Sequence, residues 1–245
     1  MSPEPVKNLL LSALPAPGWQ RLLPHLQWVE LRAGTVLYDA GVTLRHVYFP
    51  TTATVSLSAL MQDGGSAEVA VVGNEGVAGI CAFLGGGASM SRAVVHSAGH
   101  CLRMGANEIS VASGDSVPVM RALLRYTQAL FTQMAQTSAC NRSHALDQRL
   151  CRWLLAHHDR VAGDELLATH EGIADLLGVR REGVTAGALK LQSAGLIRYN
   201  RGRVSILDRQ GLAAKSCECH AVIEHAYDSL RDAAAGSTPP QLLPA

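Results

Sequence analysis

The stretch Thr169–Ile197, THEGIADLLGVRREGVTAGALKLQSAGLI, decides the fold of the C-terminal part of this chain. Thr169 is a favourable helix N-cap, and Gly178 predicts a sharp helix end because glycine adopts the left-handed conformation without strain. A second helix begins near Arg180. Apolar residues of the first helix recur at helical spacing, at Ile173, Leu176 and Leu177. Two short helices joined by a tight turn are typical of a helix-turn-helix, whose second helix can lie in the major groove of DNA.

The first turns of the second helix carry side chains that suit base edges. An arginine in the groove can donate two hydrogen bonds to guanine, and a glutamate can accept one from cytosine. We expect the base-reading residues to be Arg181, Glu182, Thr185 and Ala186. Contacts to phosphate position a protein without specifying sequence, and we expect them from Thr169, Arg180, Lys190, Arg198, Arg201 and Arg203. The alternative for all of these residues is a solvated helix end and hairpin face.

Charge supports this interpretation only locally. The net charge is +1 over 245 residues, whereas the segment from Asp147 to Lys215 holds eleven Lys and Arg against eight Asp and Glu. Hydrophobic residues make up 48% and charged residues 17%, which is an ordinary globular composition. No run approaches the roughly 20 apolar residues of a membrane span, and the N-terminus is a poor signal peptide. We therefore expect a cytoplasmic protein with reduced thiols.

The pattern upstream changes to short β segments. Seven of them lie between Trp28 and Ala106: WVELR, TVLYDAG, HVYFP, TVSLSALM, AEVAVVG, AVVHSAG and CLRMGA. Many short alternating segments separated by glycine predict an antiparallel sandwich or barrel. A glycine-rich interruption, GNEGVAGICAFLGGGASMSR, lies between Gly73 and Arg92.

A long helical pattern follows, from Pro118 to Ala145. Apolar residues recur about every 3.5 residues along one face of this helix, a pattern that favours pairing with a second copy of the chain. We expect this dimer interface at Leu123, Leu130, Met134, Thr137 and Asn141. A two-fold dimer would place two recognition helices on a palindromic DNA site.

The order of these parts resembles the Crp/Fnr family of bacterial transcription regulators over about residues 20–215. The most specific stretch, Leu177–Val184 (LGVRREGV), is similar to the family pattern of Gly, a small residue, Ser, Arg, Glu, a small residue and Val. The resemblance implies an α+β fold with a cyclic-nucleotide-binding-type β roll of the jelly-roll or double-stranded β-helix kind, a central dimerisation helix and a winged helix-turn-helix. It also implies contact with RNA polymerase and no enzymatic activity.

This resemblance divides the chain into five parts. They are an N-terminal helical cap at 1–27, a sensory β roll at 28–117, a dimerisation helix at 118–145, a winged helix-turn-helix at 146–215, and a C-terminal helix with a loose tail at 216–245.

Two departures from the family pattern bear on function. Cyclic-nucleotide binders of the family carry a Glu after a Gly in the glycine-rich segment, whereas here Gly79 is followed by Ile80. Arg92 could still hold a phosphate. We expect effector contacts at Gly79, Ile80 and Arg92 but no binding of cyclic AMP, and no cofactor. Ala186 stands where members of the cyclic AMP receptor type have a second arginine, so the preferred DNA sequence should differ.

Two alternatives concern the cysteines and histidines. A metal, haem or thiol redox sensor could gate the same DNA-binding domain, because Cys217-Glu218-Cys219-His220 carries metal-binding side chains, and His96 and His100 lie near Cys101. Cys-x-Cys-His lacks a fourth ligand nearby in sequence, so we expect no bound metal and reduced thiols, with Cys140 and Cys151 buried near the hinge. A hydrolase using His157 to Asp159 is the remaining alternative, but no further ligands are spaced for it.

Overall fold

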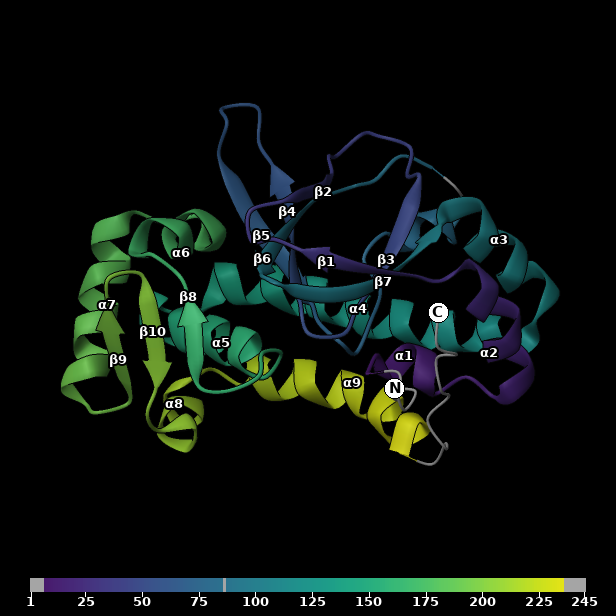
Figure 1. Ribbon diagram of the computed structural model, residues 1–245. Coiled ribbons are helices and arrows are strands. Elements are labelled where there is room, and N and C mark those ends of the chain that lie inside the picture. The colour runs from purple at the N-terminus through teal and green to yellow at the C-terminus, as the bar shows by residue number, and fades with distance from the viewer. Residues whose placement is uncertain (1–6, 86, 236–245) are drawn as a thin grey trace.

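The computed structural model describes residues 7–85 and 87–235. Figure 1 shows an N-terminal β roll above two long helices, with a smaller helical domain at one end. Residues 1–6 of the expected N-terminal cap lie outside the described residues, and so does the tail expected from Ser237 onward.

Two antiparallel sheets form the roll, and all seven predicted strands are confirmed. One sheet has the order β1 (Gln27–Leu31), β7 (Gly99–Gly105), β3 (His46–Pro50). The other has the order β2 (Val36–Tyr38), β6 (Arg92–Ser97), β4 (Thr54–Leu60), β5 (Ser66–Val72). Val55 and Leu57 of β4 point into the roll core, as their alternation with serine predicts. Ser56 and Ser58 face the opposite side and are nevertheless buried, because the C-terminal domain lies over that face.

Helices close the roll from below and at its ends. The short ones are α1 (Leu9–Ser12), α2 (Ala16–Leu22), η1 (Leu23–His25), η2 (Ile80–Ala82) and α3 (Ala106–Asp115). The two long ones, α4 (Val117–Ser143) and α9 (Cys219–Ala235), pack side by side beneath the roll (Figure 1). Their buried side chains, Tyr126 of α4 and Tyr227 of α9 among them, belong to the same core as the roll. Within the described residues, no helix is long and apolar enough to cross a membrane.

The residues expected at a dimer seam on α4 are covered by the chain itself. Leu123, Leu130 and Thr137 are buried in the chain's own structure, Met134 packs against the same core, and Asn141 is half-buried. The outward row is instead Val117, Leu124 and Phe131, which are 62%, 48% and 50% exposed. Apolar residues stand at adjacent positions on this helix, so periodicity could not decide which of two neighbouring faces meets the roll.

The C-terminal domain is a winged helix-turn-helix with its own core. It comprises α5 (Leu146–His158), β8 (Glu165–Leu167), α6 (His170–Leu177), α7 (Arg181–Ser193), β9 (Ile197–Asn200), β10 (Arg203–Ile206) and α8 (Arg209–Lys215). The Thr169 hydroxyl accepts a hydrogen bond from the Gly172 amide at 3.0 Å, and Gly178 has a φ of 62°, so both predicted helix boundaries are confirmed. The wing turns at Arg201 and Gly202, and β8 adds a third strand that the sequence did not predict.

Two glycines inside α7 have a packing reason. A Cβ on Gly183 would lie 2.7 Å from Leu146, and a Cβ on Gly187 would lie 3.0 Å from Leu150. Since Leu146 and Leu150 belong to α5, the glycines let α7 approach α5 closely and thereby fix the tilt of the recognition helix on its own domain.

Candidate nucleic-acid interface

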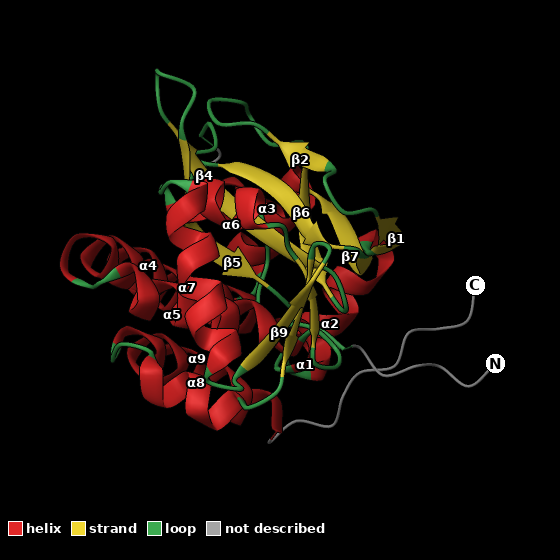
Figure 2. Ribbon diagram, turned by 90° about the vertical axis from the view of Figure 1, so that its left-hand side faces the viewer, coloured by secondary structure: helices red, strands yellow, loops and turns green. Residues whose placement is uncertain are grey.

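The outer face of α7 carries the predicted base-reading residues. Arg181, Glu182 and Ala186 are exposed, whereas Val184 and Ala188 on the opposite face are buried. Figure 2 looks onto this end of the molecule, where α7 lies at the surface beside α6. Arg181 Nε lies 3.7 Å from Glu171 Oε2, and both side chains are about two-thirds exposed. Such a pair is weak in water, so the Arg181 guanidinium is available to a base edge.

Thr185 is held by its neighbours. Its hydroxyl donates to the Arg181 carbonyl at 3.1 Å and lies 3.0 Å from His170 Nδ1. Burial, followed by the nearby Arg181 charge, lowers the pKa of His170, so the neutral ring donates from Nδ1 to this hydroxyl. The His170 ring also stacks on Tyr199 at 3.9 Å. The Thr185 hydroxyl is therefore engaged within the protein, which leaves its methyl group to contact a thymine methyl.

The predicted phosphate contacts fall into two groups. Arg180, Arg198 and Arg201 are exposed and form no ion pair with any residue that the structure describes. Arg203 pairs with Glu165 at 2.9 Å and Lys190 pairs with Asp147 at 2.8 Å. Thr169 serves as the N-cap of α6. The first group presents positive charge to solvent beside α7 and on the wing, as a phosphate contact requires.

A buried polar cluster joins this domain to the roll. Glu68 of β5 lies 3.1 Å from His157 Nε2 of α5 and accepts a hydrogen bond from the Ser56 hydroxyl at 2.5 Å. The His96 ring lies 4.1 Å from the His157 ring and 5.5 Å from that of Trp153. Burial, aided by His157, lowers the pKa of His96 to about 3, so the ring is neutral at pH 7. Sequence reasoning missed this cluster because its members are far apart in the chain.

A second buried pair lies nearby. Arg160 Nε donates to Glu75 Oε1 at 2.7 Å, and both side chains are nearly inaccessible. The Gly73 amide donates to the same Glu75 oxygen at 3.1 Å, and a Cβ on Gly73 would crowd both partners. A Cβ on Gly76 would collide with the Tyr126 ring. The glycines at the start of this glycine-rich segment thus leave room for neighbouring side chains of the chain itself, rather than for a ligand.

The residues predicted to meet an effector do not converge. Ile80 is buried in the roll core after Gly79, whereas Arg92 begins β6 and its Nε lies 3.2 Å from Asp39. Arg92 lines a pocket of about 650 Å³ between the roll and α6, and neither Gly79 nor Ile80 reaches it. The other lining side chains include Ser56, Ser58, His96, Thr169 and Asp175. The three residues therefore do not line one pocket, because Ile80 lies in the roll core whereas Arg92 lies beside α6.

The side chains named by the haem and hydrolase alternatives do not come together as those alternatives require. Cys101 is buried in a small core cluster, and His100 stacks on Trp28 at 5.2 Å, whereas the half-buried His96 contacts His157 and Trp153. His157 points to Glu68, whereas Asp159 accepts two hydrogen bonds from Arg209 at 2.7 and 2.8 Å. Burial opposes ionisation of Asp159, but hydrogen bonds from His220 and Arg209 outweigh it and keep its pKa below the usual range. The side chains of His157 and Asp159 therefore point to different partners and do not form one catalytic site.

Comparisons with known families agree with this architecture. Residues 28–111 match the cyclic nucleotide-binding domain, and residues 148–215 match the Crp-like helix-turn-helix domain. No similar sequence was found among curated proteins.

Solved structures share the fold over most of the chain. A transcriptional regulator of the Crp/Fnr family from Eubacterium rectale is 19% identical, with a TM-score of 0.66, over 84% of this chain and 96% of that one. FixK2 from Bradyrhizobium japonicum is 19% identical, with a TM-score of 0.68, over 78% and 98%. The c-di-GMP-responsive global regulator CLP of Xanthomonas campestris is 16% identical, with a TM-score of 0.63, over 78% and 99%. These structures show the fold that the chain shares. The two matched domains identify the chain as a DNA-binding transcription regulator of the Crp/Fnr family.

Proposed function

We propose that the protein acts as a homodimer that reads a palindromic DNA site with two copies of α7. The observation that carries this proposal is the outward face of α7, where Arg181, Glu182 and Ala186 are exposed beside the exposed cations Arg180 and Arg198. A base-reading arginine flanked by phosphate-binding cations is the arrangement that groove recognition requires.

Selection from a random DNA library with the full-length protein tests this proposal. We expect enrichment of an inverted repeat whose half-sites are centred about 10 base pairs, or one helical turn, apart. Recovery of unrelated sequences, or of a single half-site only, would contradict the palindromic arrangement.

The exposed row on α4 supports the dimer. Val117, Leu124 and Phe131 recur every seven residues on the side of α4 that faces away from the roll. Apolar side chains at heptad spacing on a long helix are suited to packing against a second helix of the same kind. We therefore place the dimer interface on this row.

The Phe131→Glu substitution is expected to convert the dimer to a monomer, because it places a charge in the middle of an apolar interface. Sedimentation at micromolar concentration measures the mass. Val111→Glu is the matched control, because Val111 is similarly exposed and belongs to another helix, α3. Palindrome affinity should fall with the dimer fraction. A Phe131→Glu variant that remains a dimer would refute this interface.

The roll is proposed to gate DNA binding through its contacts with the C-terminal domain. An effector would act by shifting the population between docked and DNA-competent arrangements of that domain. We infer that cyclic AMP is not this effector, because the position after Gly79 holds the buried Ile80 and Arg92 lies elsewhere. The melting temperature should be the same with and without excess cyclic AMP, and a rise with added nucleotide would contradict this. Contact with RNA polymerase follows from the family and remains a proposal here.

A further inference from the structure

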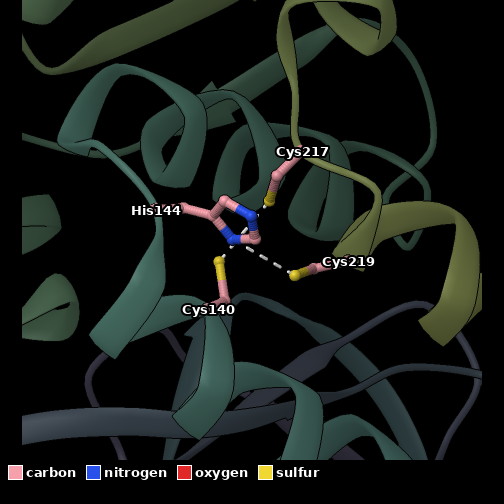
Figure 3. A group of neighbouring side chains, drawn as sticks. All are labelled: Cys140, His144, Cys217 and Cys219. Carbon is pink, nitrogen blue, oxygen red and sulfur yellow. Dashed lines mark hydrogen bonds between the residues drawn. The ribbon is translucent and has the colours of Figure 1, made fainter.

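Four metal-binding side chains converge at the hinge between α4 and α5. Cys140 lies in the last turn of α4, His144 caps that helix, and Cys217 and Cys219 lie where α8 leads into α9. Figure 3 shows the three sulfur atoms around the imidazole ring. Their ligand atoms all lie within 4.8 Å of one another. All three cysteines are buried, and each is a free thiol in the described part of the chain.

The distances suit one small ion. Cys140 Sγ lies 3.5 Å from Cys217 Sγ, and Cys219 Sγ lies 3.5 Å from His144 Nδ1. Ligand atoms around a tetrahedral zinc ion, with Zn–S of about 2.3 Å and Zn–N of about 2.0 Å, lie about 3.5–3.8 Å apart. An iron–sulfur cluster places its own atoms between the protein sulfurs and therefore needs them further apart. The group is thus close to the geometry of a mononuclear site.

Two neighbouring side chains orient the ligands. His144 Nε2 lies 3.2 Å from Glu218 Oε1, and the other ring nitrogen, Nδ1, faces Cys219 Sγ at 3.5 Å. The Gln136 amide donates to Cys219 Sγ at 3.2 Å. A carboxylate behind the histidine and a hydrogen bond to a thiolate sulfur are the outer contacts that tune metal ligands in proteins.

We propose that Cys140, His144, Cys217 and Cys219 form a Cys₃His site for a single Zn²⁺ ion. Three thiolates and one imidazole in tetrahedral arrangement favour zinc over hard cations such as magnesium or calcium. The sequence predicts no metal because Cys217, Cys219 and His220 have no fourth ligand close to them in the chain. His220 instead faces Asp159, and the missing ligands come from α4 and its C-cap, more than seventy residues away.

The location gives the ion a mechanical role. Cys140 lies in α4, the helix that carries the proposed dimer interface, and His144 caps the end of that helix. Cys217 and Cys219 lie where the DNA-binding domain connects to α9. An ion bound to all four would tie these segments together at the hinge. Because the ligand set does not exist in the unfolded chain, zinc binding contributes directly to the stability of the folded protein.

The test uses the full-length reduced protein, stripped with a chelator and titrated with ZnCl₂ against a chromophoric competitor. We expect one zinc per chain and a higher melting temperature on loading. Co²⁺ in its place should give thiolate charge-transfer bands and the visible bands of a tetrahedral ion. Cys217→Ser and Cys140→Ser should weaken binding by more than about 100-fold, which exceeds the effect of an outer contact. Cys151→Ser, at a buried cysteine outside the group, should leave binding unchanged.

A second variant keeps the assignment testable if the serine variants do not fold. Glu218 is 72% exposed, so Glu218→Gln should fold normally and weaken zinc binding by about 10-fold or more through His144. The proposal is overturned if the reduced protein binds no zinc, or if the Cys217→Ser variant binds zinc as tightly as the parent protein. It is also overturned if a disulfide between Cys140 and Cys217 persists under reducing conditions, or if only an iron–sulfur chromophore forms. None of these measurements involves DNA, so they stand apart from the test of DNA reading.

Discussion

Replacing Arg160 with methionine is expected to lower the free energy of unfolding by about 3–5 kcal/mol, because Glu75 would keep a charge in the interior without a partner. Both side chains are buried, and Arg160 Nε donates to Glu75 at 2.7 Å. Arg160 also donates to the Ala156 carbonyl, and its guanidinium lies 5.5 Å from the centre of the Tyr227 ring. The substitution would therefore disturb the junction of the roll, α5 and α9 together.

Urea denaturation of the variant and the parent protein measures this difference. The double variant Glu75→Gln, Arg160→Met should recover part of the stability, since it removes the unpaired charge as well. Arg203→Met is the matched control, because the exposed pair of Arg203 and Glu165 should contribute less than about 1 kcal/mol. If Arg160→Met were no less stable than Arg203→Met, the pair would not hold the two domains together.

Arg181→Ala is expected to remove sequence discrimination while leaving the fold and the dimer intact. A good bidentate contact with guanine contributes about 1–3 kcal/mol of discrimination at each half-site. Two half-sites then amount to about 2–6 kcal/mol, which is roughly a 30-fold or larger decrease in affinity for the selected palindrome. Arg181 is exposed and only weakly paired with Glu171, so its removal should not cost stability.

Competition between the selected palindrome and a scrambled duplex measures this effect by fluorescence anisotropy. Arg201→Ala on the wing is the control. Removing a cation that binds phosphate should weaken both duplexes alike, and it should reduce the salt dependence of binding by about one unit for each phosphate that is no longer neutralised. Full selectivity in Arg181→Ala would mean that α7 does not read bases through this residue.

Local patterns predicted the elements of this fold. Alternating apolar positions identified the seven strands of the roll, and Thr169 and Gly178 fixed the ends of α6, because these signals act within a few residues. The helix α3 and the strand β8 were not predicted from the sequence. β8 is only three residues long, and its partner β10 lies far along the chain, so pairing rather than local preference makes it a strand.

The outward face of α4 shows a different limit. Leu123 and Leu124 are adjacent, as are Leu130 and Phe131, so either pair of positions satisfies the same period. Only packing against the roll and α9 buries Leu123 and Leu130 and leaves Leu124 and Phe131 outside. The residues that the sequence placed on a dimer seam are therefore covered by the chain itself, and a different row of α4 is exposed.

The sequence by itself determined the helix-turn-helix, the strands of the roll and the residue types on the recognition helix, because hydrophobic period, caps and turns are local. Only the tertiary structure decided which distant side chains meet. It paired Glu75 with Arg160 and Glu68 with His157, and it brought Cys140 and His144 to Cys217 and Cys219. Buried polar groups need partners wherever the fold supplies them, and a short motif such as Cys-x-Cys cannot indicate a ligand that lies on another helix.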